Sequence, residues 1–191
     1  LMPLIVDGIA ASDAFPRLLG VDDPQTYLLL ALNEDELRPG GGFITGVGEI
    51  KIGDGRVLAM DFKDSYAVDD FSLPYPDPPD PLYAFMGVEL LVLRDSNWSP
   101  DFPASAKQAI ELYRPGYPVD VAGVIGIDQV GVQMLVEAVG PLALPGAAEP
   151  VTGDDLLDYI HGAWAPDDGK LDREWWQQRK SFIGDVAGAA V

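Results

Sequence analysis

A continuous apolar run, Tyr-Leu-Leu-Leu-Ala-Leu at residues 27–32, constrains the fold of this chain more than any other feature. Strands that are covered on both faces of a sheet read as unbroken apolar runs, whereas strands with one wet face alternate apolar and polar residues. We therefore expect residues 26–32 to form an inner strand of a sheet that has other elements packed on each face.

A β-hairpin is expected directly downstream. Residues 43–52 and 56–62 have strand-like composition, and Gly53-Asp54-Gly55 between them is typical of a tight turn. The remaining expected elements are short helices in residues 4–19, broken near Pro16; a strand at 88–93; a helix from Pro103 to about Arg114; a strand at 121–127; a helix capped by Asp128 and running through Val139; a helix at 156–161; and a last helix capped by Asp172.

The order of these elements predicts the fold class. Strands come first and then alternate with helices, which favours a three-layer α/β/α sandwich with a mixed central sheet. A chain of 191 residues suits a single domain over residues 1–191. Residues 69–81 are dense in Pro and Asp, and Pro blocks both strand ladders and helix interiors, so we expect an irregular surface excursion there.

The charge balance bears on the partners of the chain. It has 31 acidic and 12 basic side chains and a net charge of -19. Neutralisation of phosphates supplies most nonspecific nucleic-acid affinity, and anionic membranes attract basic segments. The composition therefore argues against nucleic-acid binding and against unaided docking on a membrane. An anionic ligand is expected only where the few Arg and Lys residues cluster.

Residue types and chain ends narrow the chemistry further. The chain has no Cys and a single His, His161, which argues against thiol catalysis, disulfides and multi-histidine metal sites. No segment has the roughly eighteen apolar residues of a membrane helix. The abrupt start at Leu1 and end at Val191 suggest a piece of a longer protein, so we expect any membrane anchor to lie outside it.

A polar loop at residues 33–42 follows the apolar strand and ends in Gly40-Gly41-Gly42. Consecutive glycines let backbone N–H groups approach an anion, and Arg38 can form a bidentate pair with phosphate or carboxylate. We take Arg38, Gly41 and Gly42 as candidate ligand-binding residues. The alternative, which the local sequence favours, is a tight turn in which Arg38 pairs with Glu34 or Glu36.

A second polar stretch, at residues 94–103, lies between an expected strand and a helix, where α/β proteins commonly bind ligands. The alternative is a structural loop in which Arg94 pairs with Asp95 or Asp101 and Trp98 fills the core. The candidate ligand-binding residues of this stretch are Arg94, Asp95, Asn97, Trp98 and Asp101.

Further candidates lie elsewhere in the chain. Lys63 and Asp64 end an expected strand, where Asp64 can hold a metal and the alternative is a solvated strand end. Arg173 and Arg179 lie on the last helix, whose basic face is unusual in so acidic a chain. His161, near a helix end beside Gly162, is interpreted as a cap or surface residue.

Two long motifs resemble a bacterial family called domain of unknown function 4012. They are Asn-x-x-Glu-Leu-Arg-Pro-x-Gly-Gly-Phe at residues 33–43 and Arg-Asp-x-Asn-Trp-Ser-Pro-Asp-Phe-Pro-x-Ser-Ala at residues 94–106, followed by Val-Ile-x-Ile-Asp at 124–128 and Gly140-Pro141. The resemblance implies a membrane segment upstream and a domain outside the cytoplasm.

The order of elements is also similar to that of the LytR–CpsA–Psr cell-wall ligases, which transfer a glycopolymer phosphate from a polyprenyl diphosphate carrier. The resemblance implies a related α/β/α sandwich in which Arg38, the pair Lys63-Asp64, Arg173 and Arg179 surround a diphosphate and Mg²⁺. The sequence departs from that pattern at Gly40, where the ligases have an acidic metal ligand, and at Lys63, where they have Arg.

Three functional hypotheses follow. The first is a membrane-anchored, extracytoplasmic envelope domain that binds an anionic glycan or a polyprenyl phosphate near Arg38, Asp64, Arg94 and Arg179, without established catalysis. The second is a phosphotransferase of the ligase type in which Asp64 binds Mg²⁺ or acts as a base. The third is a protein-interaction scaffold that uses the Pro-rich excursion at 69–81.

Overall fold

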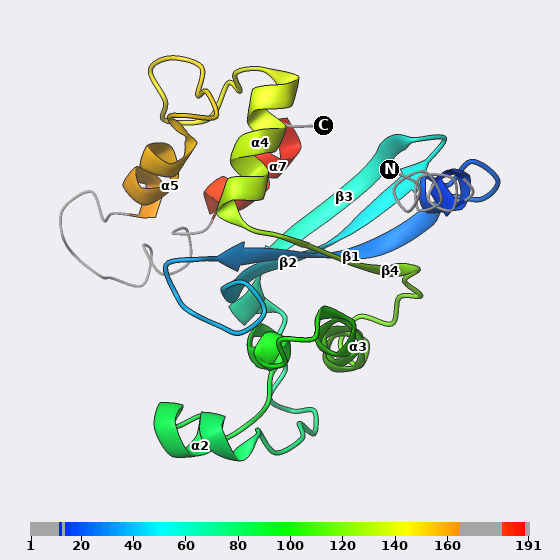
Figure 1. Cartoon of the computed structure of the whole chain (residues 1–191), viewed down its shortest axis with the longest axis vertical. Coiled ribbons are helices and arrows are strands. Elements are labelled where there is room, and N and C mark those ends of the chain that lie inside the picture. The colour runs from blue at the N-terminus through cyan, green and yellow to red at the C-terminus, as the bar shows by residue number, and fades with distance from the viewer. Residues whose placement is uncertain (1–11, 13, 165–180, 190–191) are drawn as a thin grey trace, which may run out of the picture.

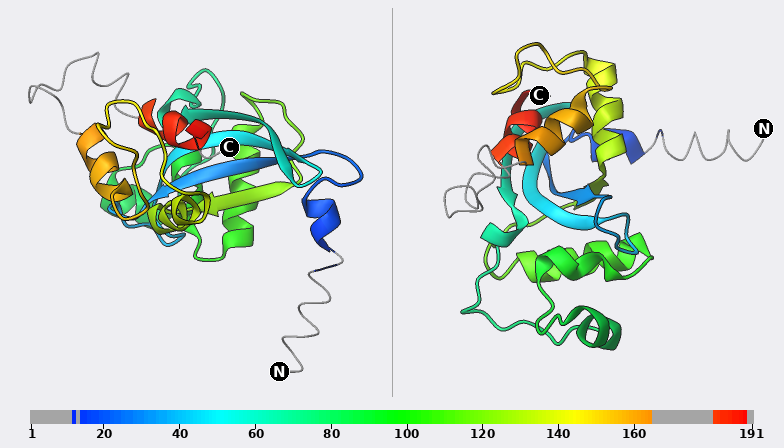
Figure 2. Two further views of the ribbon diagram at one scale, coloured as in Figure 1. Left: turned by 90° about the horizontal axis from the view of Figure 1, so that it is seen from above. Right: turned by 90° about the vertical axis from the view of Figure 1, so that its left-hand side faces the viewer.

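The computed structural model describes residues 12, 14–164 and 181–189. It has a four-stranded mixed sheet in the order β3-β2-β1-β4, with helices on either side of it (Figures 1 and 2). β1 (Gln25–Asn33) pairs antiparallel with β2 (Phe43–Gly53) and parallel with β4 (Gly123–Ile127), and β2 pairs antiparallel with β3 (Arg56–Asp64). The mixed sheet and the α/β class are confirmed.

The helical elements are η1 (Ser65–Ala67), α2 (Asp80–Met86), η2 (Leu93–Trp98), α3 (Phe102–Tyr113), α4 (Gln129–Val139), α5 (Leu156–Trp164) and α7 (Ser181–Ala189). Several were predicted close to these bounds. Asp128 caps α4 as expected, because its Oδ1 accepts a hydrogen bond from Gly131 N at 2.7 Å. None of the helices described here is long and apolar enough to cross a membrane.

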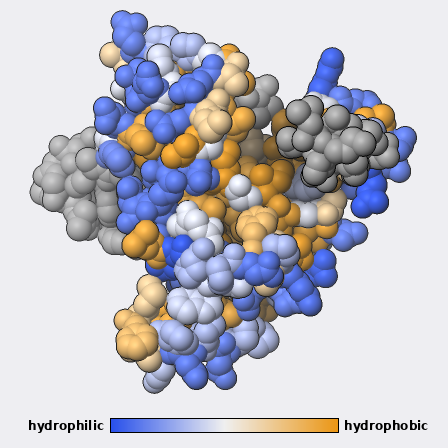
Figure 3. Space-filling view, viewed as in Figure 1, coloured by the Kyte–Doolittle hydropathy of each residue, from blue (hydrophilic) through white to orange (hydrophobic). Residues whose placement is uncertain are grey.

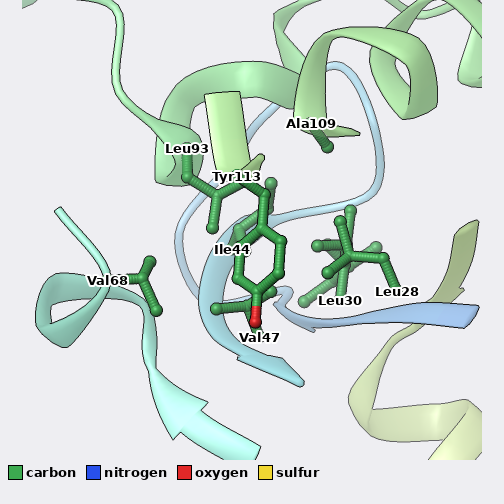
Figure 4. Packing of buried hydrophobic residues seen from close by; sticks show 9 residues of the cluster. Leu28, Leu30, Ile44, Val47, Val68, Leu93, Ala109 and Tyr113 are labelled. Atoms are coloured by element: carbon green, nitrogen blue, oxygen red, sulfur yellow. The ribbon is translucent and has the colours of Figure 1, made fainter. Parts of the chain in front are cut away.

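The face of the sheet toward α3 and η2 carries the tighter core (Figure 4). Alternate residues of β1 point into it, and Leu28 and Leu30 are 0% and 2% exposed. The buried members of this cluster are Leu28, Leu30, Leu32, Ile44, Val47, Val68, Leu93, Ala109 and Tyr113.

The opposite face lies toward α4, α5 and α7 (Figure 2). Here a second cluster forms mainly between the helices and the loop that joins α4 to α5; its buried members are Val136, Leu142, Leu144, Val151, Leu156 and Val186. The intervening β1 residues, Leu29 and Ala31, are only partly buried. The apolar run of β1 is therefore filled tightly on one face and loosely on the other, which is the feature that positions the site below.

The hairpin between β2 and β3 is confirmed. Its loop is the two-residue segment Asp54-Gly55, and both residues have positive φ, 50° and 71°. Positive φ at both central positions is the geometry of a type I′ turn, which matches the twist of paired strands.

Two sequence expectations are wrong within the described residues. Residues 88–93 form no strand, because the backbone is held by loop contacts instead: Leu91 N donates to Pro76 O at 3.0 Å and Val88 N to Leu82 O at 3.3 Å. Residues 14–18 are helical through Pro16, whose carbonyl accepts from Val21 N at 2.9 Å, so the expected break there is absent.

The Pro-rich excursion is irregular as predicted, but it ends in a helix that the sequence did not suggest. Asp80 begins α2 with Pro81 in its first turn, where the missing N–H costs nothing. Gly87 ends the helix with a φ of 66°. The excursion and α2 lie beyond α3, on the side away from α4 and α5 (Figure 1).

Candidate functional site

Three of the predicted segments meet in one cluster beside β2. The guanidinium of Arg38 lies over the ring of Phe43, with 5.0 Å from Cζ to the ring centroid, and Arg94 lies over Tyr66 at 4.4 Å. The Phe43 and Tyr66 rings are 6.3 Å apart. We call this group, with the two carboxylates described next, the arginine cluster. Its aromatic rings carry favourable cation–π contacts to both arginines.

Each arginine of the cluster faces a carboxylate. Arg38 Nη2 is 3.5 Å from Asp95 Oδ1, and these side chains are 12% and 7% exposed. Arg94 pairs with Asp69, whose side chain is 1% exposed. The alternatives suggested by the sequence, Arg38 with Glu34 or Glu36 and Arg94 with Asp95 or Asp101, are therefore wrong. The two pairs leave the cluster electrically balanced, which weakens it as an anion site.

The glycine loop packs closely against its neighbours. Asn97 Nδ2 donates to Gly42 O at 2.6 Å, which joins the two motif segments. A Cβ at Gly42, where φ is 126°, would lie 2.4 Å from Asn33 O, and a Cβ at Gly40 would lie 2.8 Å from Asn97 O. Close backbone approach is therefore sufficient to explain Gly40 and Gly42.

Several polar atoms in this region are buried and lack a hydrogen-bond partner among the described residues. They are Arg38 Nε, Ser65 Oγ, Asp69 Oδ1, Ser96 Oγ and Asn97 Oδ1. Both donors and acceptors are present, which is the composition that ordered water satisfies.

The other predicted site residues are placed as follows. Lys63 pairs with Asp61, and its Nζ lies 5.4 Å from the centroid of the Tyr117 ring. Asp64 caps η1 by accepting from Tyr66 N at 3.0 Å. Trp98 is half-buried, and Asp101 is exposed at the start of α3. Arg173 and Arg179 lie outside the described residues.

The described residues offer no ligand set for the Mg²⁺ that the transferase hypothesis expects. Over residues 14–164 and 181–189, no three His, Asp or Glu side chains gather in a group suited to a metal ion. Asp64 is used instead at the start of η1.

A cavity of about 370 Å³ lies between the sheet and the helices α4, α5 and α7. We call it the sheet–helix cavity. Its walls are mainly aliphatic and come from all four strands and the three helices, with Phe62 of β3 among them. Figure 3 shows apolar surface gathered in the middle of the molecule, where α4 meets the sheet. Ile125 and Leu135, both in its lining, are 36% and 50% exposed, so the cavity opens to solvent.

One end of this cavity is polar, at the carboxyl ends of the neighbouring parallel strands β1 and β4. Gln129 Nε2 donates to Asn33 Oδ1 at 2.8 Å, and His161 Nε2 lies 3.2 Å from Asp35 Oδ2. Asn33 is 2% exposed, and its Nδ2 has no partner among the described residues. We refer to Asn33, Asp35, Gln129 and His161 as the polar end.

The surroundings of the polar end are acidic. Partial burial and the neighbouring Asp128 carboxylate raise the pKa of Glu34, and Asp35 raises it further, against a hydrogen bond from Val130 N that lowers it. The carboxylates of Asp128 and Asp35 therefore act on Glu34 here, and a further negative group would be repelled.

The sequence motifs do not include the polar end, although the sequence contains a signal for it. Asn33 and Asp35 follow one predicted strand and Asp128 and Gln129 follow another. Ligands of α/β proteins commonly lie at the carboxyl ends of adjacent parallel strands. Pairing of β1 with β4 was needed to bring the two ends together, and residue patterns did not specify that pairing. His161 was interpreted as a cap or surface residue, and its contact with Asp35 depends on the placement of α5.

Comparison with known proteins supports one assignment. None of the curated proteins compared with the chain matches it significantly. A family profile described as protein of unknown function (DUF4012) matches residues 22–163, which include the sheet, both motif segments and most of α5. The chain therefore belongs to the DUF4012 family.

Proposed function

We propose that this domain binds an amphiphile whose hydrocarbon chain occupies the sheet–helix cavity. The observation that carries the proposal is the cavity itself: about 370 Å³, with aliphatic walls and hydrogen-bonding side chains gathered at one end. Small-molecule sites are commonly concave and mostly apolar, with a few polar groups that fix orientation, and occupy about 300–1,000 Å³.

The biological setting of the proposal is the cell envelope. The resemblance to domain of unknown function 4012 points to an extracytoplasmic, membrane-anchored domain. The resemblance to the LytR–CpsA–Psr ligases, with their three-layer α/β/α sandwich, points to lipid-linked phosphates or cell-wall glycans as ligands. Helices on both sides of the sheet and a cavity beneath one layer are compatible with that grouping. The cavity supports the lipid part of such a ligand, whereas the balanced arginine cluster gives little support to the phosphate part.

Filling the cavity tests the proposal. Ala31 lies in the wall and is partly buried, so Ala31→Phe places a ring where the hydrocarbon chain is proposed to lie. Ala59→Phe is the matched control, because Ala59 is exposed on β3 and does not line the cavity. Isothermal titration with decyl glucoside below its critical micelle concentration measures binding.

We expect Ala31→Phe to weaken binding of decyl glucoside at least about tenfold, whereas Ala59→Phe leaves it unchanged. Circular dichroism confirms that both variants are folded. Equal binding by the two variants, or no binding by the unmodified protein of any decyl compound with an uncharged or charged head, would contradict the proposed function.

A second function, a protein-interaction surface, is favoured by residues 69–90, which we call the acidic arm. It exposes large apolar side chains: Phe85 is 86% exposed, Phe71 65% and Tyr83 63%. Besides Asp69, which is buried and pairs with Arg94, the arm contains Asp70, Asp77, Asp80 and Glu89, and it has no Lys or Arg. Aromatic anchors in an acidic setting fit a basic, amphipathic segment of a partner protein, because the charges are complementary.

Three synthetic helical peptides of Leu with Lys, Gln or Glu test this surface. We expect only the Lys peptide to bind, and Phe85→Ser to weaken it about tenfold or more. Leu37→Ser is the control, since Leu37 is 89% exposed but lies outside the arm. Binding of the Gln peptide as tight as that of the Lys peptide would contradict the role of charge. Equal loss of affinity for the Lys peptide in Phe85→Ser and Leu37→Ser would contradict the location of the binding surface on the acidic arm.

A further inference from the structure

The chemistry of the polar end specifies more than an apolar chain. Asn33 is the most informative residue, because it lines the cavity, is 2% exposed and has an Nδ2 without a partner among the described residues. Its Oδ1 is already used twice, accepting from Gln129 Nε2 at 2.8 Å and from Asp35 N at 3.1 Å. These two donors fix the orientation of the amide, so the unused group is the N–H₂ donor. A buried donor without an acceptor is costly, and a ligand atom that accepts removes the cost.

The carboxylates around this donor call for hydrogen-bond donors from a ligand, whereas Asn33 Nδ2 calls for an acceptor. Asp35 contributes one oxygen to His161 at 3.2 Å, and Asp128 uses Oδ1 to cap α4. An ionised carboxylate accepts about four hydrogen bonds, so both retain free acceptor capacity. Desolvation raises the pKa of Glu34, and the neighbouring carboxylates of Asp128 and Asp35 raise it further. The polar end therefore combines one buried donor without a partner among the described residues with several acceptors.

From this geometry we propose that the polar end takes a neutral, hydroxyl-rich headgroup, so that the ligand of the cavity is a glycosylated lipid. This inference rests on the proposed function. A hydroxyl donates one hydrogen bond and accepts two, which matches a carboxylate and the Asn33 amide at once. A sugar supplies several hydroxyls on a rigid ring.

Two other headgroups fit this end less well. A phosphate satisfies the Asn33 donor but brings negative charge against Glu34, Asp35 and Asp128, and like charges at short range are strongly unfavourable. A quaternary ammonium is attracted by the carboxylates but has no acceptor for Asn33 Nδ2. The hydroxyl-rich head is the one that satisfies both groups.

A series of compounds with one chain and three heads tests the inference on the unmodified protein. Decyl glucoside, decyl phosphate and decyltrimethylammonium are titrated below their critical micelle concentrations, and their dissociation constants are compared. Since the chain is constant, differences report the head alone. We expect decyl glucoside to bind about tenfold or more tightly than either charged compound.

Two variants locate the effect. Asn33→Leu has nearly the same shape and removes the donor without adding a carboxyl group, so decyl glucoside should bind about tenfold more weakly. The matched control is Asn97→Leu, because Asn97 is similarly buried but contacts Gly42 on the other side of the sheet. Asp35→Asn, at a side chain 56% exposed, tolerates substitution and should bind decyl phosphate more tightly than the unmodified protein does.

The outcomes separate this inference from the function on which it rests. Tighter binding of decyl phosphate than of decyl glucoside, lost again in Ala31→Phe, overturns the headgroup and leaves the cavity function standing. Equal affinity for all three heads, unchanged in Asp35→Asn, overturns the headgroup as well. Failure of every decyl compound to bind overturns both.

Discussion

Arg38 and Asp95 show how this protein handles charge away from water. The two side chains lie 3.5 Å apart, largely buried, and come from segments far apart in the sequence. Removing one partner of a buried pair costs far more stability than the intact pair contributes, because the other charge is left buried without a counter-ion. The same logic applies to Arg94 and Asp69. These pairs hold the loop after β1, η2 and the residues after η1 together.

Replacing Asp95 with Asn is expected to destabilise the fold by about 3 kcal/mol, since Arg38 then stays charged and loses its counter-ion. Urea unfolding followed by circular dichroism measures the change. Glu111→Gln provides the control, because the Glu111–Lys107 pair, at 3.9 Å, is exposed and is expected to be worth about 0.5 kcal/mol or less. A loss of stability in Asp95→Asn no larger than that in Glu111→Gln would mean that the arginine cluster is more hydrated than its burial indicates.

Glu34 gives a pH-dependent prediction. Its pKa in the folded state is raised, so the native protein binds the proton more tightly than the unfolded chain does. Stability therefore falls as pH rises from the ordinary carboxyl pKa to the raised one, and the loss persists above it. Glu34→Gln removes the charge, so we expect a higher melting temperature than the unmodified protein at pH about 7 and no difference at pH about 3, where both are neutral.

Thermal melts at the two pH values check this prediction, with Glu111→Gln as the control that loses an exposed carboxylate elsewhere. A gain in Glu34→Gln that is the same at both pH values would assign the effect to something other than titration of Glu34.

At the residue scale, the sequence predicted a helix cap correctly and the partners of the two buried arginines wrongly. Asp128 was identified as a helix cap because the acceptor and the donor, Gly131 N, are three residues apart. Arg38 was expected to pair within its own loop, but Asp95 is the better-placed partner once η2 packs on β2. Charge compensation between segments depends on tertiary packing, which a local pattern does not contain.

At the scale of elements, β2 and β3 show how glycines shape the sheet–helix cavity. The ring of Phe62 lies against Gly46 and Gly48, where a Cβ would come within 2.3 Å and 2.6 Å of ring atoms. The ring is therefore drawn down onto β2 and forms part of the cavity wall. Glycines beneath an aromatic ring let the ring lie close against the sheet, which leaves space above it.

Adding a single methyl group under this ring should change both stability and cavity. In Gly46→Ala the new Cβ would meet Phe62 Cε1 at 2.3 Å, so the ring must shift, and we expect a loss of about 1–3 kcal/mol in urea unfolding. Gly116→Ala is the matched control, because its Cβ would meet nothing closer than 3.9 Å, and it should be neutral or slightly stabilising. Equal effects in both variants would show that the ring is not confined by Gly46.

The elements themselves were largely predictable, and their environments were not. Residues 27–32 were correctly predicted as an inner strand because apolar runs report burial, but the run did not reveal that one side faces a cavity. Residues 88–93 have strand-like composition and form no strand, because Pro76 and Leu82 carbonyls take their N–H groups. Composition reports burial more reliably than it reports the hydrogen-bond partner that makes a strand.

At the scale of the whole molecule, the large net negative charge is the main electrostatic feature. A net charge of -19 means that compact states place many carboxylates close together. Such self-repulsion keeps a protein soluble and opposes folding. The acidic arm and the surroundings of the polar end are two places where acidic residues gather, whereas the arginine cluster is internally balanced. Screening by salt should therefore act on the exposed acidic regions and leave the buried pairs nearly unaffected.

Salt is accordingly expected to stabilise the protein. Raising NaCl from about 0.01 M to about 0.5 M shortens the Debye length from about 30 Å to less than about 8 Å, so repulsion among exposed carboxylates is screened, and we expect a gain of about 1 kcal/mol in urea unfolding. The double variant Asp77→Asn, Glu89→Gln, at two exposed positions of the acidic arm, should gain less from the same salt because less repulsion is present to screen. A loss of stability with salt would mean that attractive pairs such as Arg38–Asp95 are more accessible to ions than their burial implies, and that compensation between segments outweighs the overall negative charge in setting the stability of this fold.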